Sequence, residues 1–202
     1  MRRVVIASAL VIAAVATAAC APRAIRGGAD TENPSLDRPA LSVSLDKADI
    51  DYLVAQNNDL LFESRFWIRD VEGASKPPVL AIWPIENATT QHLGDQMLTL
   101  LSALETSLVN SGDVRVVARA AQQDLAHEIG IQQGAIYDQA SAQRLGRQLG
   151  AQYFLTGKIT SVDERLKNTR RVQYSLFLQV IEIETGLIKF QNEASHSKAL
   201  KR

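Results

Sequence analysis

The sequence predicts an α/β fold in which a mixed β-sheet packs with α-helices, preceded by a signal peptide and a flexible tether. Three observations predict this arrangement. The first twenty residues have the order of charged, apolar and small residues that is typical of secretory signals. The middle of the chain alternates helical periodicity with short apolar runs. The last third alternates apolar and polar residues as antiparallel strands do.

The N-terminal segment, residues 1–19, is interpreted as a lipoprotein signal peptide. Two arginines follow Met1, an apolar run covers residues 4–16, and small residues lead to Cys20. The run is shorter than the ~20 residues that span a bilayer, so a permanent transmembrane helix is not expected. Cys20 is the only cysteine of the chain, and its thiol is expected to carry the lipid anchor through a thioether. The alternative is a soluble secreted protein in which Cys20 is incidental.

The lipid anchor predicts where the protein resides. Acyl chains such as palmitate contribute about 0.8 kcal/mol for each buried CH₂, so two or more chains hold a protein stably at a membrane. The residue after Cys20 is Ala21 and not Asp, which in Gram-negative lipoproteins usually implies sorting to the outer membrane. We therefore expect a lipid-anchored protein of the outer membrane that faces the periplasm.

Composition limits the rest of the chain to one folded domain. Removing residues 1–19 from the 202 leaves 183, enough for a compact domain and a tether. Subtracting Arg2 and Arg3 from 22 basic side chains leaves 20 against 22 acidic ones, so no nucleic-acid partner is expected. Acylation of Cys20 leaves no thiol for a disulfide or a metal. Residues 20–43 predict the flexible linker, which would average ~26 Å as a coil, and the domain is expected over 44–202.

The first half of the domain is expected to begin with a helix. Apolar residues recur at helical spacing from Ile50 to Ile68, and three aspartates lie where a helix N-terminus favours acids, so a helix is predicted over 46–69. The run Val79–Trp83 is short and continuously apolar between prolines, as in a buried strand that Pro84 ends. One apolar stripe and the pair Ser111-Gly112 predict a second helix over 93–110 with its C-terminal cap.

The second half is expected to end in strands. The predicted elements are, in order, a strand over 114–117, helices over 120–129 and 139–149, and strands over 153–162, 172–183 and 187–193. Gly150 is expected to stop the last helix. Every second residue from Val172 to Val180 is apolar, which indicates a strand with one buried face. The last three strands therefore favour an antiparallel meander, which makes the sheet mixed.

A search for catalytic residues predicts that the protein is not an enzyme. His127-Glu128 begins like a zinc-protease motif, but the position of the second ligand is Ile131. The other histidines of the chain are His92 and His196. No serine has the glycines of a nucleophile elbow, and no glycine-rich loop ends in the Lys and Ser or Thr of a phosphate-binding loop. Glu182 and Glu184 are interpreted as solvated hairpin charges, so no metal, cofactor or small-molecule substrate is expected.

Basic residues gather around the connection between the third and fourth predicted strands. Lys158 lies nearby, and the candidate partner contact is the set Arg165, Lys167, Arg170 and Arg171. A protruding basic hairpin can meet an acidic partner surface. The alternative is a hairpin whose charge only keeps it soluble.

The block Ile85-Glu86-Asn87-Ala88-Thr89 leaves the first buried strand and precedes a helix. Asn and Thr side chains there can bond to local backbone and cap that helix, so we expect a mainly structural role for Asn87.

Three blocks of the chain resemble the LpoB family, the outer-membrane lipoprotein activators of penicillin-binding proteins. They are residues 76–89, with Lys-Pro-Pro-Val-Leu-Ala-Ile-Trp-Pro, residues 145–157, with Gly-Ala-Gln-Tyr, and residues 174–188. The resemblance covers about residues 44–192, and related domains include the N-terminal domain of TolB and the secretion lipoprotein CsgG.

The resemblance implies a non-enzymatic regulator that touches a bifunctional peptidoglycan synthase, a penicillin-binding protein, and raises its polymerising and cross-linking activity, supporting cell-wall synthesis and cell shape. The anchor, the tether and the domain are compatible with a protein that works by contact. The alternatives are a secretion or assembly lipoprotein of the CsgG and TolB kind and a periplasmic enzyme whose site the sequence does not reveal.

Overall fold

The computed structural model describes residues 25, 27, 31–128 and 139–201, and the chain divides into two compact units between Pro39 and Ala40. Cys20 and the predicted signal peptide lie outside the described residues. In the first unit, Asn33 organises a turn, because its carbonyl accepts from the amide of Leu36 at 3.1 Å.

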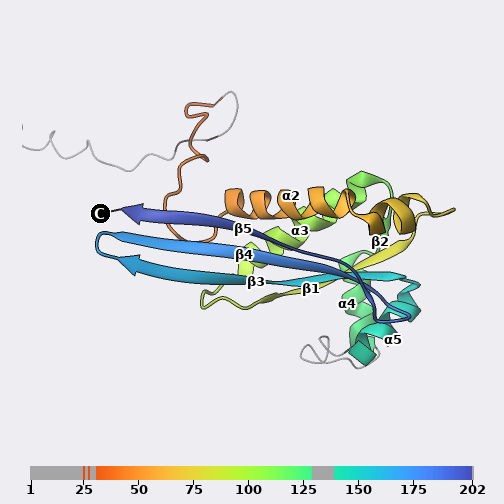
Figure 1. Cartoon of the computed structure of the whole chain (residues 1–202). Helices are drawn as coiled ribbons and strands as arrows, with labels where there is room; N and C mark the ends of the chain where they lie inside the picture. Colours follow the sequence, from red (N-terminus) through yellow and green to blue (C-terminus); the bar gives the residue numbers. More distant parts are fainter. Residues whose placement is uncertain (1–24, 26, 28–30, 129–138, 202) are drawn as a thin grey trace, which may run out of the picture. The chain divides into compact units, whose positions relative to one another are not determined.

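The second unit contains helices and one five-stranded sheet (Figure 1). Its elements are α2 (Lys47–Phe62), the π-helix η1 (Trp67–Glu72), β1 (Val79–Asn87), α3 (Gly94–Ser111), β2 (Arg115–Val116), α4 (Arg119–Glu128), α5 (Gln139–Leu149), β3 (Tyr153–Leu166), β4 (Thr169–Glu182) and β5 (Ile188–Lys201). The strands lie in the order β2-β1-β3-β4-β5. β1 runs parallel to β2 and β3, whereas β3, β4 and β5 pair antiparallel, so the predicted mixed sheet and meander are confirmed.

The first predicted helix is two elements. α2 begins at Asp46, whose side chain accepts from the amide of Asp49 while the Asp49 side chain accepts from the amide of Asp46, a capping box. The prediction that this helix continues to Arg69 is wrong. Ser64 interrupts it, because its hydroxyl donates to the carbonyl of Leu61 and accepts from the amide of Trp67, where η1 begins.

Two predicted helix ends are confirmed by glycines in the left-handed conformation. Gly112, with φ of 78°, caps α3, and Gly150, with φ of 65°, follows α5. This conformation is strained for residues that carry a Cβ, so glycine is the favoured residue at both helix ends.

The first strand does not end at Pro84, as the sequence predicted. β1 continues to Asn87, and its register with β3 shifts between Ile82 and Ile85. Proline has no N–H to donate, so a bulge at this point lets the strand pass it and resume pairing. Pairing resumes where Ile85 lies opposite Gly157.

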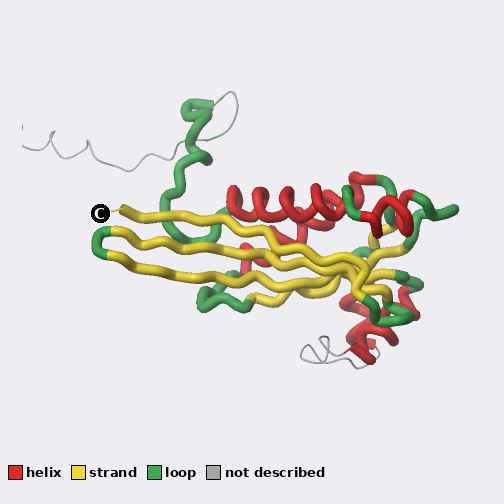
Figure 2. The backbone as a smooth tube through the Cα atoms, in the orientation of Figure 1, coloured by secondary structure: helices red, strands yellow, loops and turns green. Residues whose placement is uncertain are grey.

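The three C-terminal strands are longer than predicted. β3, β4 and β5 each contain 14 residues, whereas the sequence placed the end of the last strand at Glu193. A two-residue turn at Lys167 and Asn168 joins β3 to β4, and Lys167 has a φ of 48°. The strands therefore extend together as a ribbon toward the C-terminus (Figure 2).

The two faces of the sheet differ in their cover. Helices α2 and α3 pack on one face, over a core that includes Leu53, Leu104, Leu155 and Leu176. On the other face, a smaller cluster forms only near α5. Its buried members are Ala81, Trp83, Leu145, Ala151, Phe154 and Ile183. The rest of this second face, called the open face below, carries half-buried and exposed side chains of β3, β4 and β5.

Candidate functional site

The structure brings the four predicted contact residues together at the turn between β3 and β4, at the end of the ribbon (Figure 1). Arg165 lies directly opposite Arg170, and Lys167 lies in the turn. Arg165, Lys167 and Arg171 are exposed, whereas Arg170 is half-buried. The sequence thus predicted their proximity correctly, because the turn between the strands is short.

Strand pairing adds a fifth cation. Lys201 of β5 lies opposite Thr169, next to the turn. Lys201 was not expected here, because the sequence predicted that the last strand ends at Glu193. We call the set Arg165, Lys167, Arg170, Arg171 and Lys201 the basic tip.

Two cations of the basic tip are paired with carboxylates of β3. The Nε of Arg170 donates to both carboxylate oxygens of Asp163 at 3.1 Å, and its terminal nitrogen lies 2.6 Å from Oδ2. The Nε and a terminal nitrogen of Arg171 both donate to one oxygen, Oε2, of Glu164. The hydrogen bond from Arg170 lowers the pKa of Asp163, and the same bond raises the pKa of Arg170. Exposed pairs of this kind contribute little to folding.

The net charge of the tip remains positive. Five cations and the two carboxylates of Asp163 and Glu164 give a charge of +3. The structure describes no ion pair for Arg165, Lys167 or Lys201. An acidic surface would therefore meet an uncompensated positive charge here.

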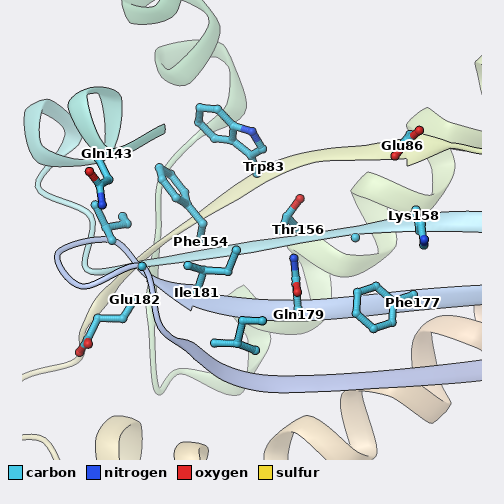
Figure 3. Close-up of a pocket in the computed structure, with 14 residues that line it drawn as sticks. Trp83, Glu86, Gln143, Phe154, Thr156, Lys158, Phe177, Gln179, Ile181 and Glu182 are labelled. Carbon is cyan, nitrogen blue, oxygen red and sulfur yellow. The ribbon is translucent and has the colours of Figure 1, made fainter. Parts of the chain in front are cut away.

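Lys158 is not part of this cluster, contrary to the prediction that placed it near the connection. It lies inside β3, opposite Phe177 and far from the turn. Its side chain borders a hollow of about 440 Å³ on the open face beside α5 (Figure 3). The hollow is lined mainly by Trp83, Phe154, Phe177, Gln143, Gln179 and Thr156.

The residues weighed as catalytic candidates do not converge. His196 lies 3.7 Å from the carboxylate of Asp49 and packs on Tyr52, with ring centroids 4.5 Å apart, while His92 is exposed elsewhere. The side chain of His127 lies outside the described part. Glu182 accepts from the hydroxyl of Thr185, as expected of a hairpin turn. Among the described residues, no group of three or more His, Cys, Asp or Glu is placed to hold a metal ion, and no helix is long and apolar enough to cross a membrane.

Asn87 organises the loop that leaves β1. Its carbonyl accepts from the amide and the hydroxyl of Thr89 at 3.1 and 2.7 Å, and its amide donates to the carbonyl of Gln91 at 2.9 Å. The predicted bonds to local backbone are confirmed. The predicted cap is wrong, because α3 begins after Leu93 without a side-chain cap.

The sequence did not predict a buried ion cluster that the structure contains. The amino group of Lys198, in β5, lies 2.7 Å from Asp46 and 2.6 Å from Asp49 at the start of α2. Burial alone would raise the pKa of Asp46, but hydrogen bonds from Lys198 and from the Asp49 backbone outweigh it and lower that pKa. Burial would likewise lower the pKa of Lys198, and its bonds to both carboxylates raise it instead. This cluster joins the last strand to the first helix of the second unit.

Comparison with known proteins gives one matching family model. Residues 51–195 match the model described as peptidoglycan-synthase activator LpoB. Among solved structures, the LpoB C-terminal domain from Escherichia coli is 19% identical, with a TM-score of 0.49, and the match covers 75% of this chain and 98% of that one. The corresponding domain from Salmonella enterica is 20% identical, with a TM-score of 0.47 and coverage of 74% and 96%.

A third similar structure is lipoprotein GNA1162 from Neisseria meningitidis. It is 14% identical, with a TM-score of 0.47, and the match covers 61% of this chain and 84% of that one. The comparison with curated proteins gives no match.

Proposed function

The chain belongs to the peptidoglycan-synthase activator LpoB family, as its motifs predicted, and from this premise we propose that it activates a bifunctional penicillin-binding protein by direct contact. The match to the family model over residues 51–195 is the observation that carries the proposal. In this proposal the protein is a regulator and not a catalyst, and it supports cell-wall synthesis by raising the rate of its partner.

The proposed activator acts from the outer membrane. Acyl chains on Cys20 hold it there, and the linker over residues 20–43 lets the domain over 44–202 reach into the periplasm. The thiol of Cys20 and the small residues before it support this part of the proposal. The linker would average ~26 Å as a coil, so the domain searches only a limited space around the anchor.

The test of activation measures glycan polymerisation directly. Each bifunctional synthase of the host is purified and given its lipid-linked precursor, with and without the full-length protein in detergent. One synthase should show a several-fold higher initial rate of polymerisation and more cross-linking when the protein is present. If the protein changes the rate of none of them, the proposed function is wrong.

The basic tip is the proposed partner contact. Its charge of +3 and the exposure of Arg165, Lys167 and Arg171 support this assignment, because a protruding charged surface steers association with a surface of opposite charge. Steering acts on the rate of association, and salt screens it over a Debye length of about 8 Å.

A surface-plasmon experiment separates this contact from a merely solvated turn. Replacing Arg165, Lys167, Arg170 and Arg171 by Ser changes the tip from +3 to −1, since Lys201 then faces two carboxylates. This variant should associate at least tenfold more slowly with the synthase at low salt and lose the salt dependence of the wild type. The matched control, Asp163→Asn with Glu164→Gln, breaks the same ion pairs but makes the tip more positive, so its association should not slow. Equal association rates for wild type and the Ser variant at both salts would leave the tip as solubilising charge.

A further inference from the structure

The hollow on the open face has the size of a ligand site. Its volume of about 440 Å³ lies within the range of roughly 300–1,000 Å³ that is usual for such sites. The bulge at Pro84 lies at its rim, between Trp83 and Glu86. Gly157 forms part of its floor, where a Cβ would lie 2.0 Å from the backbone oxygen of Phe177, so the floor depends on a close approach of β3 and β4.

The lining of the hollow combines aromatic and neutral polar side chains. Trp83 and Phe154 are buried and pack together beneath it, with ring centroids 4.6 Å apart, whereas the ring of Phe177, further along β4, is only half-buried and offers an accessible aromatic face. Figure 3 shows Gln143, Gln179 and Thr156 around these rings. The structure describes no hydrogen bond from the side-chain amide of Gln143 or Gln179. Each of these amides offers two donors and an acceptor.

Charges stand only at the ends of the hollow. Glu86 and Lys158 lie opposite each other on β1 and β3, and Glu182 lies at the opposite end of the hollow. Beyond the hollow, the open face carries the neutral side chains of Thr160, Ser175 and Ser195, and the two serine hydroxyls are 2.7 Å apart. Exposed Glu193 of β5 lies opposite Phe177 on the same face. The part of the hollow between its charged ends is therefore suited to a ligand rich in neutral hydrogen-bonding groups.

The fold excludes recognition by strand addition at this place. β3 lies between β1 and β4, and β4 lies between β3 and β5, so their backbone groups are used within the sheet. A ligand on this face must be held by side chains, and sheet faces do hold oligosaccharides in this way in other folds. Hydroxyl and acetamido groups match the amides of Gln143 and Gln179, and a sugar ring has an apolar face that can pack on Phe177.

We propose that this hollow binds the glycan chain of peptidoglycan, recognising its N-acetylated sugars as a ligand and not as a substrate. The inference rests on the proposed function, which places the protein where this chain is polymerised. Binding would keep the activator at the growing strand while the basic tip contacts the synthase.

The experiment uses the full-length protein in detergent and tetra-N-acetylchitotetraose as the probe, with saturation-transfer NMR and calorimetry as readouts. The wild type should bind this probe, and Phe177→Ala or Gln179→Ala should weaken binding at least tenfold while the melting curve shows a folded protein. Leu98→Ala is the matched control, because Leu98 is 60% exposed on α3, which packs on the covered face. It should bind as the wild type does.

Two further probes test what is recognised. Cellotetraose has the same linkage without acetamido groups and should bind at least tenfold more weakly. The isolated stem peptide of peptidoglycan should not compete. Absence of binding to the chitotetraose, or preferential binding of the stem peptide, overturns the proposal.

Glycan binding and synthase binding are measured separately, so the glycan site and the proposed activation can fail independently. Glycan binding is measured without any synthase, so it stands even if the protein activates none. If Phe177→Ala abolishes synthase binding and leaves glycan binding unchanged, the hollow is a protein contact and the inference is wrong.

Discussion

Lys198 shows how one residue can join elements that are distant in the sequence. Its side chain is only 7% exposed and touches Asp46 and Asp49, the two residues that form the capping box of α2. A lysine is rarely buried unless it is paired. The two carboxylates also accept hydrogen bonds from each other's backbone amides. Lys198 therefore connects the end of β5 directly to the capping box of α2.

Replacing this lysine should destabilise the domain in a pH-dependent way. Lys198→Met leaves the buried carboxylate of Asp49 without its cation, so the free energy of unfolding should fall by about 3 kcal/mol at pH 7. The pKa of Asp46 is lower in the folded protein than in the unfolded chain. The contribution of Asp46 to the free energy of unfolding is therefore fully present above the unfolded pKa, and it is lost as the pH falls through the folded-state pKa. The pKa of Lys198 is raised in the folded protein, so the contribution of Lys198 to the free energy of unfolding is lost only as the pH rises through that raised pKa.

Urea unfolding of wild type and Lys198→Met at pH 7 and pH 3 checks this prediction. The difference between them should shrink at pH 3, because this pH lies below the ordinary pKa of an aspartate, so the unfolded chain binds a proton at Asp46 and the stabilisation from the lowered pKa begins to be lost. Lys201→Met is the matched control, since Lys201 is exposed on the same strand and its loss should leave stability unchanged. Equal stability of Lys198→Met and wild type at pH 7 would show that the buried pair contributes nothing net.

At the scale of elements, the sequence correctly predicted the helices and strands whose buried residues recur in a regular apolar pattern. β4 was found because Val172, Leu176 and Val180 alternate with polar residues and are buried. The second half of β5 was missed because its inward positions include His196 and Lys198, and only the Asp partners on α2 make such residues acceptable there. Partners that meet through tertiary structure leave no local signal.

The basic tip could be predicted from the sequence only in part. The basic residues of the β3–β4 turn are close in the sequence, so their proximity could be predicted. Their pairing with Asp163 and Glu164, and the addition of Lys201, depend on strand register, which the sequence does not supply. The hollow near Phe177 is bordered by residues on both sides of Pro84, where the sequence predicted the end of a strand.

The loop after β1 is an element whose order depends on Asn87. Gln91, which accepts from Asn87 through its carbonyl, donates from its side chain to the hydroxyl of Tyr174, and that hydroxyl donates to the carbonyl of Val43. Asn87→Ala removes three hydrogen bonds at the start of this chain of contacts, and it should reduce stability by about 1 kcal/mol and lower the melting temperature.

Activity per folded molecule should stay unchanged in this variant, because the role of Asn87 is structural. Asn87→Asp keeps the acceptor for Thr89 and loses the donor to Gln91, so it should melt between the wild type and Asn87→Ala. Thermal melting and the polymerisation assay check both statements. Unaltered melting of Asn87→Ala together with lost stimulation of the synthase would assign Asn87 to the contact instead.

At the scale of the whole molecule, the proposed function requires attachment to the membrane and contact with the synthase in one chain. The folded unit provides the basic tip and the open face, and the N-terminal region is proposed to provide the anchor. The two requirements can be separated experimentally, because the soluble synthase assay needs contact alone, whereas function in the cell also needs the anchor.

Cys20→Ala tests the anchor without touching the folded unit. Diacylglycerol attaches through a thioether, and Cys20 is the only thiol of the chain, so the variant should lose all labelling by an alkyne-tagged palmitate. Each acyl CH₂ contributes about 0.8 kcal/mol to membrane binding, so the loss of two or more chains should release the protein from the membrane fraction. Ala19→Gly keeps a small residue before the cysteine and should be labelled and retained. If Cys20→Ala stays with the membranes at low and high salt, the attachment lies elsewhere in the chain. If the variant is released and still stimulates the synthase fully in solution, the anchor and the contact are independent parts of the protein.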